Sequence, residues 1–95
     1  MAVAVRRYRV EGEVQGVGFR WFVRERARAL GLSGVVRNEP DGAVVLHVAG
    51  DSAALDALES TVRVGPSGSR VVEVLRRELT SFDAEGLPYP FTIER

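Results

Sequence analysis

The stretch that decides the fold is Gly12-Glu13-Val14-Gln15-Gly16-Val17-Gly18-Phe19-Arg20. Before it, residues 5–13 alternate between apolar or small side chains and charged ones, which is the period of a strand. After it, residues 20–31 carry apolar side chains at steps of three and four, which is the period of an amphipathic helix. The stretch therefore predicts a glycine-bent connection between a strand and the start of a helix.

Five further segments follow: strands over 34–38, 43–49, 70–78 and 91–93, and a helix over 53–64. The strands over 34–38 and 43–49 form a hairpin, because Glu39-Pro40-Asp41-Gly42 between them is a turn sequence. Asp51 or Ser52 can cap the second helix, and Gly65-Pro66 ends it. A polar loop over 80–89 leads to the last strand.

The predicted order is β-α-β-β-α-β with a short C-terminal strand. This split βαβ order is typical of an α+β, ferredoxin-like fold, in which an antiparallel sheet carries both helices on one face. The 95 residues contain no linker, low-complexity tract or repeat, so we expect a single domain over 1–95. Many unrelated functions use this layout, so the fold alone leaves the function open.

The composition excludes several kinds of chemistry. The chain has no Cys, no Lys and one His, which excludes disulfides, thiolate and lysine nucleophiles and multi-histidine metal sites. Thirteen basic residues balance thirteen acidic ones, which counts against a nucleic-acid binder. No apolar run approaches the roughly 18 residues of a membrane span, and no signal peptide is evident. We therefore expect a cytoplasmic protein that does not contact a membrane.

The glycine-rich stretch can bind an anion. Gly16 and Gly18 let the backbone turn sharply, and the helix start adds unpaired N–H groups and a partial positive charge. Arg20 lies in the first helical turn, and its planar guanidinium matches two phosphate oxygens at once. The spacing is neither a dinucleotide fingerprint nor a P-loop, and the glycines could instead only avoid clashes in a tight turn.

Asn38 is the second candidate for a functional residue. It ends a strand that can lie beside the first one, and its side-chain amide can both accept a hydrogen bond from water and donate one to it. An Asn just before a turn can also bond only to its own backbone. From the residues alone, both interpretations stay open.

Together, the two segments resemble the signature pair of the acylphosphatase family. Residues 12–20 match each fixed position of the pattern Gly-x-Val-Gln-Gly-Val-x-Phe-Arg. The second motif is matched at Gly34, Val36, Asn38, Gly42, Val44 and Gly50. The Gly65-Pro66 break and the tail over 91–93 are similar too, so the resemblance covers essentially the whole chain. Val35 departs from it, because the family commonly has an aromatic residue there, and Val45 stands where a charged residue is common.

The resemblance implies hydrolysis of a carboxyl–phosphate anhydride to a carboxylate and inorganic phosphate, without metal, cofactor or phosphoenzyme. Arg20 would bind the phosphate, and Asn38 would position the attacking water. The phosphate shell would be completed by backbone N–H groups of Gln15, Gly16, Val17, Gly18, Phe19 and Arg20. The implied partner is a small-molecule acyl phosphate, and we expect a monomer.

The alternatives are a non-catalytic anion-binding module, an RNA-binding ferredoxin-like module and a domain of a larger carbamoyl-handling enzyme. Gly18–Val23 faintly echoes an RNA-recognition motif, but it falls at a helix start.

Other conspicuous residues receive structural roles. We expect Tyr8 in the core, Asp41 in a turn, His47 in a structural or surface position and Trp21 in the core or at the pocket rim. A solvated helix face that could attract anions is expected from Arg24, Arg26 and Arg28. Val45 is expected on the outer face of the sheet, where it could support a weak dimer.

Overall fold

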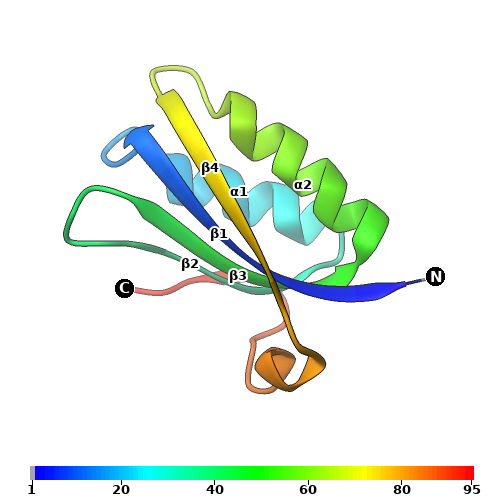
Figure 1. Cartoon of the computed structure of the whole chain (residues 1–95). Helices are drawn as coiled ribbons and strands as arrows, with labels where there is room; N and C mark the ends of the chain where they lie inside the picture. The colour runs from blue at the N-terminus through cyan, green and yellow to red at the C-terminus, as the bar shows by residue number, and fades with distance from the viewer. Residues whose placement is uncertain (1) are drawn as a thin grey trace.

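Five strands form one sheet, and two helices cover one of its faces (Figure 1). The computed structural model describes residues 2–95. Its elements are β1 (Val3–Glu13), α1 (Phe19–Ala29), β2 (Ser33–Asn38), β3 (Val44–Asp51), α2 (Ser52–Val64), β4 (Arg70–Leu79), the 3₁₀ helix η1 (Ser81–Ala84) and β5 (Thr92–Ile93). The strand order is β4-β1-β3-β2-β5, so β1 lies inside the sheet. The predicted α+β, ferredoxin-like order is confirmed.

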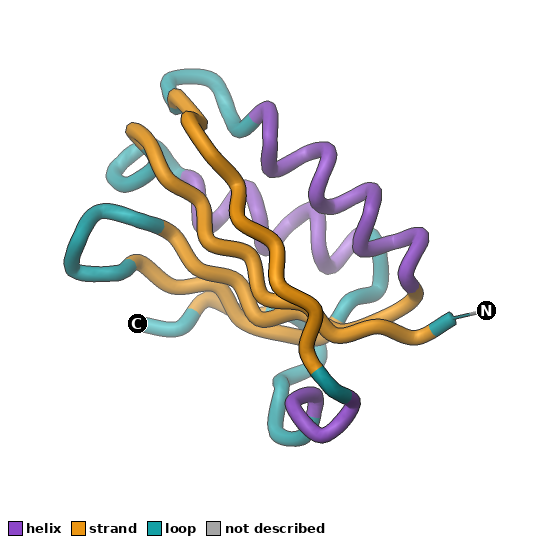
Figure 2. The backbone as a smooth tube through the Cα atoms, in the orientation of Figure 1, coloured by secondary structure: helices purple, strands orange, loops and turns teal. Residues whose placement is uncertain are grey.

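Neighbouring strands run antiparallel across β4, β1, β3 and β2. The short strand β5 differs, because it pairs in parallel with β2 through Val35↔Thr92 and Val36↔Ile93. The sequence analysis expected a C-terminal strand without giving it a neighbour, and its addition makes the sheet mixed. In Figure 2, α1 and α2 lie side by side behind the sheet, and η1 projects beyond the end of β4.

Both helices bury the apolar stripe that their sequences predict. The buried side chains are Phe19, Val23 and Ala27 in α1 and Leu55, Leu58 and Val62 in α2. Burying one Val, Leu or Phe side chain stabilises a fold by about 1.5–3 kcal/mol, so this shared core holds the helices on the sheet. Gly31 follows the end of α1 with a φ of 71°, as a helix-ending glycine does. Within residues 2–95, neither helix is both long and apolar enough to cross a membrane.

A buried charge fixes β1 to its neighbours. Arg6 is only 5% exposed, and its Nη1 donates to the Tyr8 hydroxyl at 3.1 Å and to Asp56 Oδ1 of α2 at 2.7 Å. Its Nε lies 3.1 Å from a carboxylate oxygen of Glu78 in β4. Tyr8 is fully buried, which confirms its predicted core position. Because a buried charge is costly without partners, this network aligns β1 with α2 and β4.

Val45 does not provide the exposed apolar patch that the sequence analysis expected. Its side chain is 0% exposed, although the register places it on the face of the sheet opposite the helices. Its cross-strand neighbours on that face are Arg9 of β1 and Arg37 of β2. Long arginine side chains commonly cover apolar surface with their aliphatic stems, and we infer that these two cover Val45.

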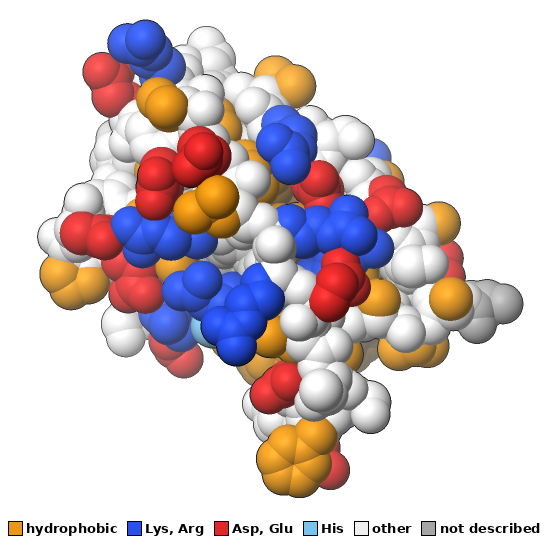
Figure 3. All heavy atoms as spheres, in the orientation of Figure 1, with side chains coloured by type: hydrophobic (Ala, Val, Ile, Leu, Met, Phe, Trp, Pro, Cys, Tyr) orange, Lys and Arg blue, Asp and Glu red, His pale blue; other side chains and the backbone are white. Residues whose placement is uncertain are grey.

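The outer face of the sheet gathers basic side chains around the single histidine (Figure 3). Arg7 of β1 lies directly opposite Arg77 of β4 on one side and His47 of β3 on the other. Within residues 2–95, no carboxylate comes within ion-pair distance of Arg7 or Arg77. Burial lowers the pKa of His47, and the charges of Arg37 and Arg7 lower it further. Among the described residues, this face therefore holds an opposed pair of arginines without carboxylate partners, beside a histidine whose pKa is lowered.

Replacing Arg77 with Thr should raise the melting temperature. Like charges directly opposite each other destabilise a sheet, and one cross-strand pair is worth about 0.2–1 kcal/mol. Thermal denaturation at low ionic strength measures the effect, which should shrink in high salt because exposed charges are screened. The matched control is Arg76→Thr, which removes a neighbouring arginine bound to Glu78 at 2.7 Å and Glu59 at 3.3 Å, and should bring no gain. A lower melting temperature for Arg77→Thr would show that the opposed arginines are not a source of instability.

Candidate active site

The end of β1 can turn toward α1 only because a glycine stands at the bend. The pairing of β1 with β4 shifts register between Glu11 and Gly12. Gly12 has a φ of 132°, and a Cβ atom there would overlap the backbone carbonyl oxygen of Arg70. Any other residue would push β1 away from β4 at this point. The glycine thus permits both the close approach of the strands and the turn that follows it.

The connection itself bends at Gly16 and Gly18, whose φ angles are 78° and 75°. These values lie in the left-handed region, which glycine adopts without steric cost. A Cβ atom at either position would meet nothing within 4 Å, so conformation and not crowding requires glycine here. Gly18 is also the N-cap of α1, and its side-chain-free position leaves the helix start without a side-chain cap. The first N–H groups of α1 are then free to bind a ligand.

The Gln15 side chain fastens this loop to the turn between β2 and β3. Its Nε2 donates to the carbonyl oxygens of Glu39 at 2.8 Å and Ala43 at 2.9 Å. The turn is shaped in addition by Asp41, whose Oδ1 accepts from the Ala43 N–H at 3.1 Å, which confirms Asp41 as a turn residue. The Gln15 side chain therefore holds the glycine loop in place next to the end of β2, where Asn38 lies.

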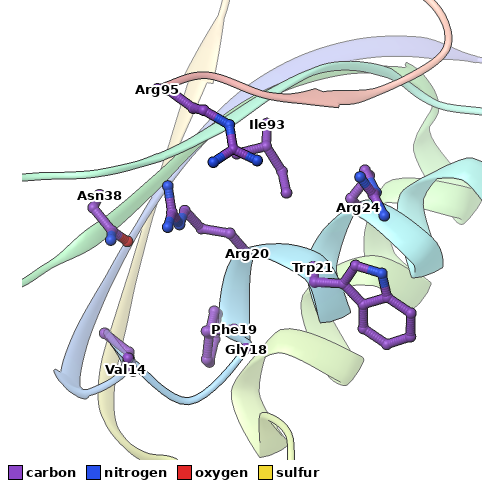
Figure 4. A pocket seen from close by; sticks show the side chains of 10 residues that line it. Val14, Gly18, Phe19, Arg20, Trp21, Arg24, Asn38, Ile93 and Arg95 are labelled. Atoms are coloured by element: carbon purple, nitrogen blue, oxygen red, sulfur yellow. The ribbon is translucent and has the colours of Figure 1, made fainter.

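A pocket of about 260 Å³ opens between the glycine loop, the start of α1, the end of β2 and the C-terminal segment. Gly16, Gly18 and Phe19 form its floor, and Arg20 and Asn38 reach into it from α1 and β2. Figure 4 shows the Arg20 guanidinium and the Asn38 amide pointing toward one another across the pocket. The structure thus brings together the two residues that sequence analysis singled out.

Two residues of the predicted phosphate shell do not line the pocket. Gln15 turns its side chain to the β2–β3 turn, and Val17 packs its side chain against the core. Their expected contribution is through backbone N–H groups. The assignment of those N–H groups to a ligand stays a prediction.

Both central side chains lack protein partners. Within residues 2–95, Asn38 Oδ1 is buried without a hydrogen-bond partner, and no carboxylate pairs with Arg20. An unsatisfied buried polar atom costs about 1–3 kcal/mol, and native structures retain few of them. An unpaired guanidinium, free helix N–H groups and an unpartnered amide oxygen together suit an anion with a water molecule beside it.

The pocket lining also includes Val14, Arg24, Ile93 and Arg95, which the sequence analysis did not assign to the site. Arg95 lines the pocket because β5 pairs with β2 and carries the C-terminal segment across its mouth. Arg24, expected on a solvated helix face, lies on the pocket wall and pairs with Glu25 at 3.0 Å. No local pattern could reveal Arg95, since its position depends on a strand pairing between distant segments. Trp21 is 58% exposed at the pocket edge, in agreement with a rim position.

Few titratable groups surround the pocket. Its lining within residues 2–95 includes no His, Asp or Glu, and the described residues contain no group of three His, Cys, Asp or Glu side chains that could hold a metal ion. His47 is on the outer face of the sheet and takes no part in the pocket. The local field is therefore set by arginines and backbone dipoles.

Comparison with known proteins agrees with this geometry. The family model for acylphosphatase matches residues 6–86. An acylphosphatase of Archaeoglobus fulgidus is 43% identical over 82 residues, which make up 84% of this chain and 92% of that protein. The crystal structure of acylphosphatase from Bacillus subtilis has a TM-score of 0.90 at 35% identity and covers 99% of this chain and 100% of its own. Full-length HypF, solved in a phosphate- and nucleotide-bound form, has a TM-score of 0.84 at 27% identity, over 99% of this chain and 12% of HypF.

The match spans the glycine loop, the strand that ends in Asn38 and both helices. With that coverage, and with relatives of the same name over most of their own length, this chain belongs to the acylphosphatase family.

Proposed function

We propose that this chain hydrolyses acyl phosphates with Arg20 holding the phosphoryl group and Asn38 placing the attacking water. Membership of the acylphosphatase family supports the reaction. The observation that carries the residue assignment is the meeting of Arg20, Asn38 and the uncapped start of α1 in one pocket. Arg20 and the helix start come from the beginning of α1, and Asn38 comes from the end of β2. Within residues 2–95, Asn38 Oδ1 has no hydrogen-bond partner and Arg20 has no carboxylate partner.

The first task of the site is to bind a dianion and its developing charge. Phosphoryl transfer passes through a loose transition state, in which charge spreads over three equatorial oxygens. The Arg20 fork can bind two of these oxygens, and N–H groups of the glycine loop and of the α1 start can bind the third. Because these donors are held in place by the fold, they need little reorganisation as the charge develops.

The second task is to align water with the phosphorus atom. The Asn38 amide oxygen accepts a hydrogen bond from the water, which leaves a lone pair of the water directed at phosphorus. As the new P–O bond forms, the bond to the acyl oxygen breaks and its electron pair leaves on the carboxylate. The water proton passes to a phosphate oxygen of the substrate, since no side chain in the pocket serves as a base. A carboxylate is a good leaving group, so it requires no general acid.

The Gln15 side chain is a positioning residue in this mechanism. Its amide joins the loop that carries the phosphate donors to the turn that follows Asn38. The distance between the bound phosphoryl group and the attacking water therefore depends on the two hydrogen bonds of Gln15, although Gln15 contacts neither group through its side chain. Reaction rates are sensitive to displacements of this kind.

The RNA-binding alternative gains no support from the sheet. RNA-recognition domains of this topology stack bases on aromatic side chains of the outer sheet face. In β1 and β3 that face carries Arg7, Arg9, Val45 and His47, with no Phe, Tyr or Trp side chain.

Asn38→Ala and Arg20→Lys should separate the two tasks. Removing one such donor or acceptor typically costs about 10²–10³ in rate, so Asn38→Ala should lower kcat on this scale and leave inhibition by inorganic phosphate nearly intact. Arg20→Lys keeps the charge but loses the fork, so both phosphate affinity and kcat/KM should fall. Hydrolysis of benzoyl phosphate in the presence of EDTA measures both variants. Turnover of Asn38→Ala at the wild-type rate would remove Asn38 from the mechanism.

Gln15→Leu should lower kcat by about tenfold, because an apolar side chain cannot hold the loop to the β2–β3 turn. The same substitution should lower the free energy of unfolding by about 1–3 kcal/mol, because two hydrogen bonds are lost. The exposed neighbour Glu13 has no ion pair within residues 2–95, so Glu13→Ala serves as the control and should change neither quantity. Steady-state kinetics at a temperature where both variants are folded gives the comparison. A Gln15→Leu enzyme that loses stability but keeps kcat would limit Gln15 to a structural role.

The rate should be nearly independent of pH between about 6 and 8, because no pocket side chain titrates there. His47, whose pKa is lowered, lies outside the pocket. His47→Gln should therefore leave the pH profile of kcat/KM unchanged. An inflection near pH 6–7 that disappears in His47→Gln would instead link the histidine to catalysis.

A further inference from the structure

We propose that Arg24 and Arg95 form a second anion subsite in the same pocket, which selects acyl phosphates whose acyl group carries a carboxylate. The inference rests on the proposed function and names the substrate class that the pocket favours. Neither arginine is needed for the phosphoryl chemistry described above. Their presence in the pocket lining therefore calls for a different ligand group.

The charge of the pocket exceeds what a phosphoryl group requires. Three guanidinium groups line it, those of Arg20, Arg24 and Arg95, whereas no Asp or Glu side chain of residues 2–95 does; of the three, Arg24 pairs with Glu25 beside the pocket. The phosphoryl group of an acyl phosphate carries at most two negative charges, and Arg20 with the helix and loop N–H groups already faces it. A third negative charge on the acyl group would match the remaining guanidinium groups.

The three arginines follow the path that an acyl group would take out of the phosphate cradle. Arg24 lies one helical turn beyond Arg20 on the same side of α1, because residues four apart on a helix are neighbours. Figure 4 shows the Arg95 guanidinium beside that of Arg20, and Arg24 farther along the helix near Trp21. Ile93 lies between these groups and Trp21 lies at the pocket edge, and both supply apolar surface on which the carbon skeleton of an acyl group can pack.

The donors of this subsite are available. Only Nε of Arg24 is engaged, by Glu25 Oε2 at 3.0 Å, which holds the side chain and leaves both terminal nitrogens free. Arg95 has no ion pair within residues 2–95. Arg28, one turn further along α1, also uses only its Nε, which donates to the Phe91 carbonyl oxygen at 2.7 Å, but Arg28 does not line the pocket.

The test compares two substrates of nearly equal shape, 4-carboxybenzoyl phosphate and 4-methylbenzoyl phosphate. The para carboxylate reaches away from the phosphoryl group and cannot attack it. We expect kcat/KM to favour the carboxylated substrate by about tenfold, which corresponds to one charge-assisted hydrogen bond, and this preference should fall as NaCl is added. Arg24→Gln and Arg95→Gln should each reduce the ratio of the two kcat/KM values, and the double variant should bring it near one.

Arg26→Gln is the matched control, because Arg26 is exposed on α1 but outside this pocket. It should keep the wild-type ratio. If wild-type enzyme hydrolyses both substrates with equal kcat/KM, the subsite is refuted and the proposed function survives. If Arg26→Gln lowers the ratio as much as Arg24→Gln does, the preference reflects general positive charge and the subsite is refuted as well. If neither substrate is hydrolysed, the proposed function fails and takes the subsite with it.

Discussion

The site depends on a connection of five residues between β1 and α1 that only glycine can bend. Gly16 and Gly18 take left-handed backbone conformations, and the space beside them is open. A side chain at either position would strain the backbone and enter the pocket. Because β1 lies inside the sheet and α1 packs across it, the position of the helix start is fixed by the core. The loop can then keep its N–H groups free for a ligand, at no cost in core packing.

Charge is distributed unevenly in a chain whose net charge is zero. Carboxylates neutralise arginines on the outer face and on α2, as in the pairs Arg9–Asp41 at 2.6 Å and Arg63–Glu59 at 3.1 Å. In the pocket, by contrast, only Arg24 has a carboxylate partner among the described residues. Exposed pairs of this kind contribute little to stability. Within residues 2–95, guanidinium groups without a carboxylate partner remain both in the pocket and at the Arg7–Arg77 pair on the outer face.

Most of the fold could be predicted from the sequence, because its signals are local. The alternation around Tyr8 and the stripe that includes Leu55 and Leu58 report burial directly, and the structure confirms both. Val45 shows the limit of this reasoning: its outward direction was correct, but cover by side chains of neighbouring strands is not visible in a single strand. The same limit applies to the site, where Arg20 and Asn38 belong to short motifs and Arg95 enters through a long-range pairing.

The pairing of β5 with β2 affects both the border of the sheet and the pocket. A strand at the border of a sheet exposes unpaired backbone groups that can recruit other chains, and β5 covers part of β2 against this. Thr92 and Ile93, the two residues of β5, are followed closely along the chain by Arg95, which lines the pocket. A single short strand pairing thus shields a vulnerable border and supplies part of the binding surface, so a variant that loses this pairing should lose both the shielded border and the pocket position of Arg95.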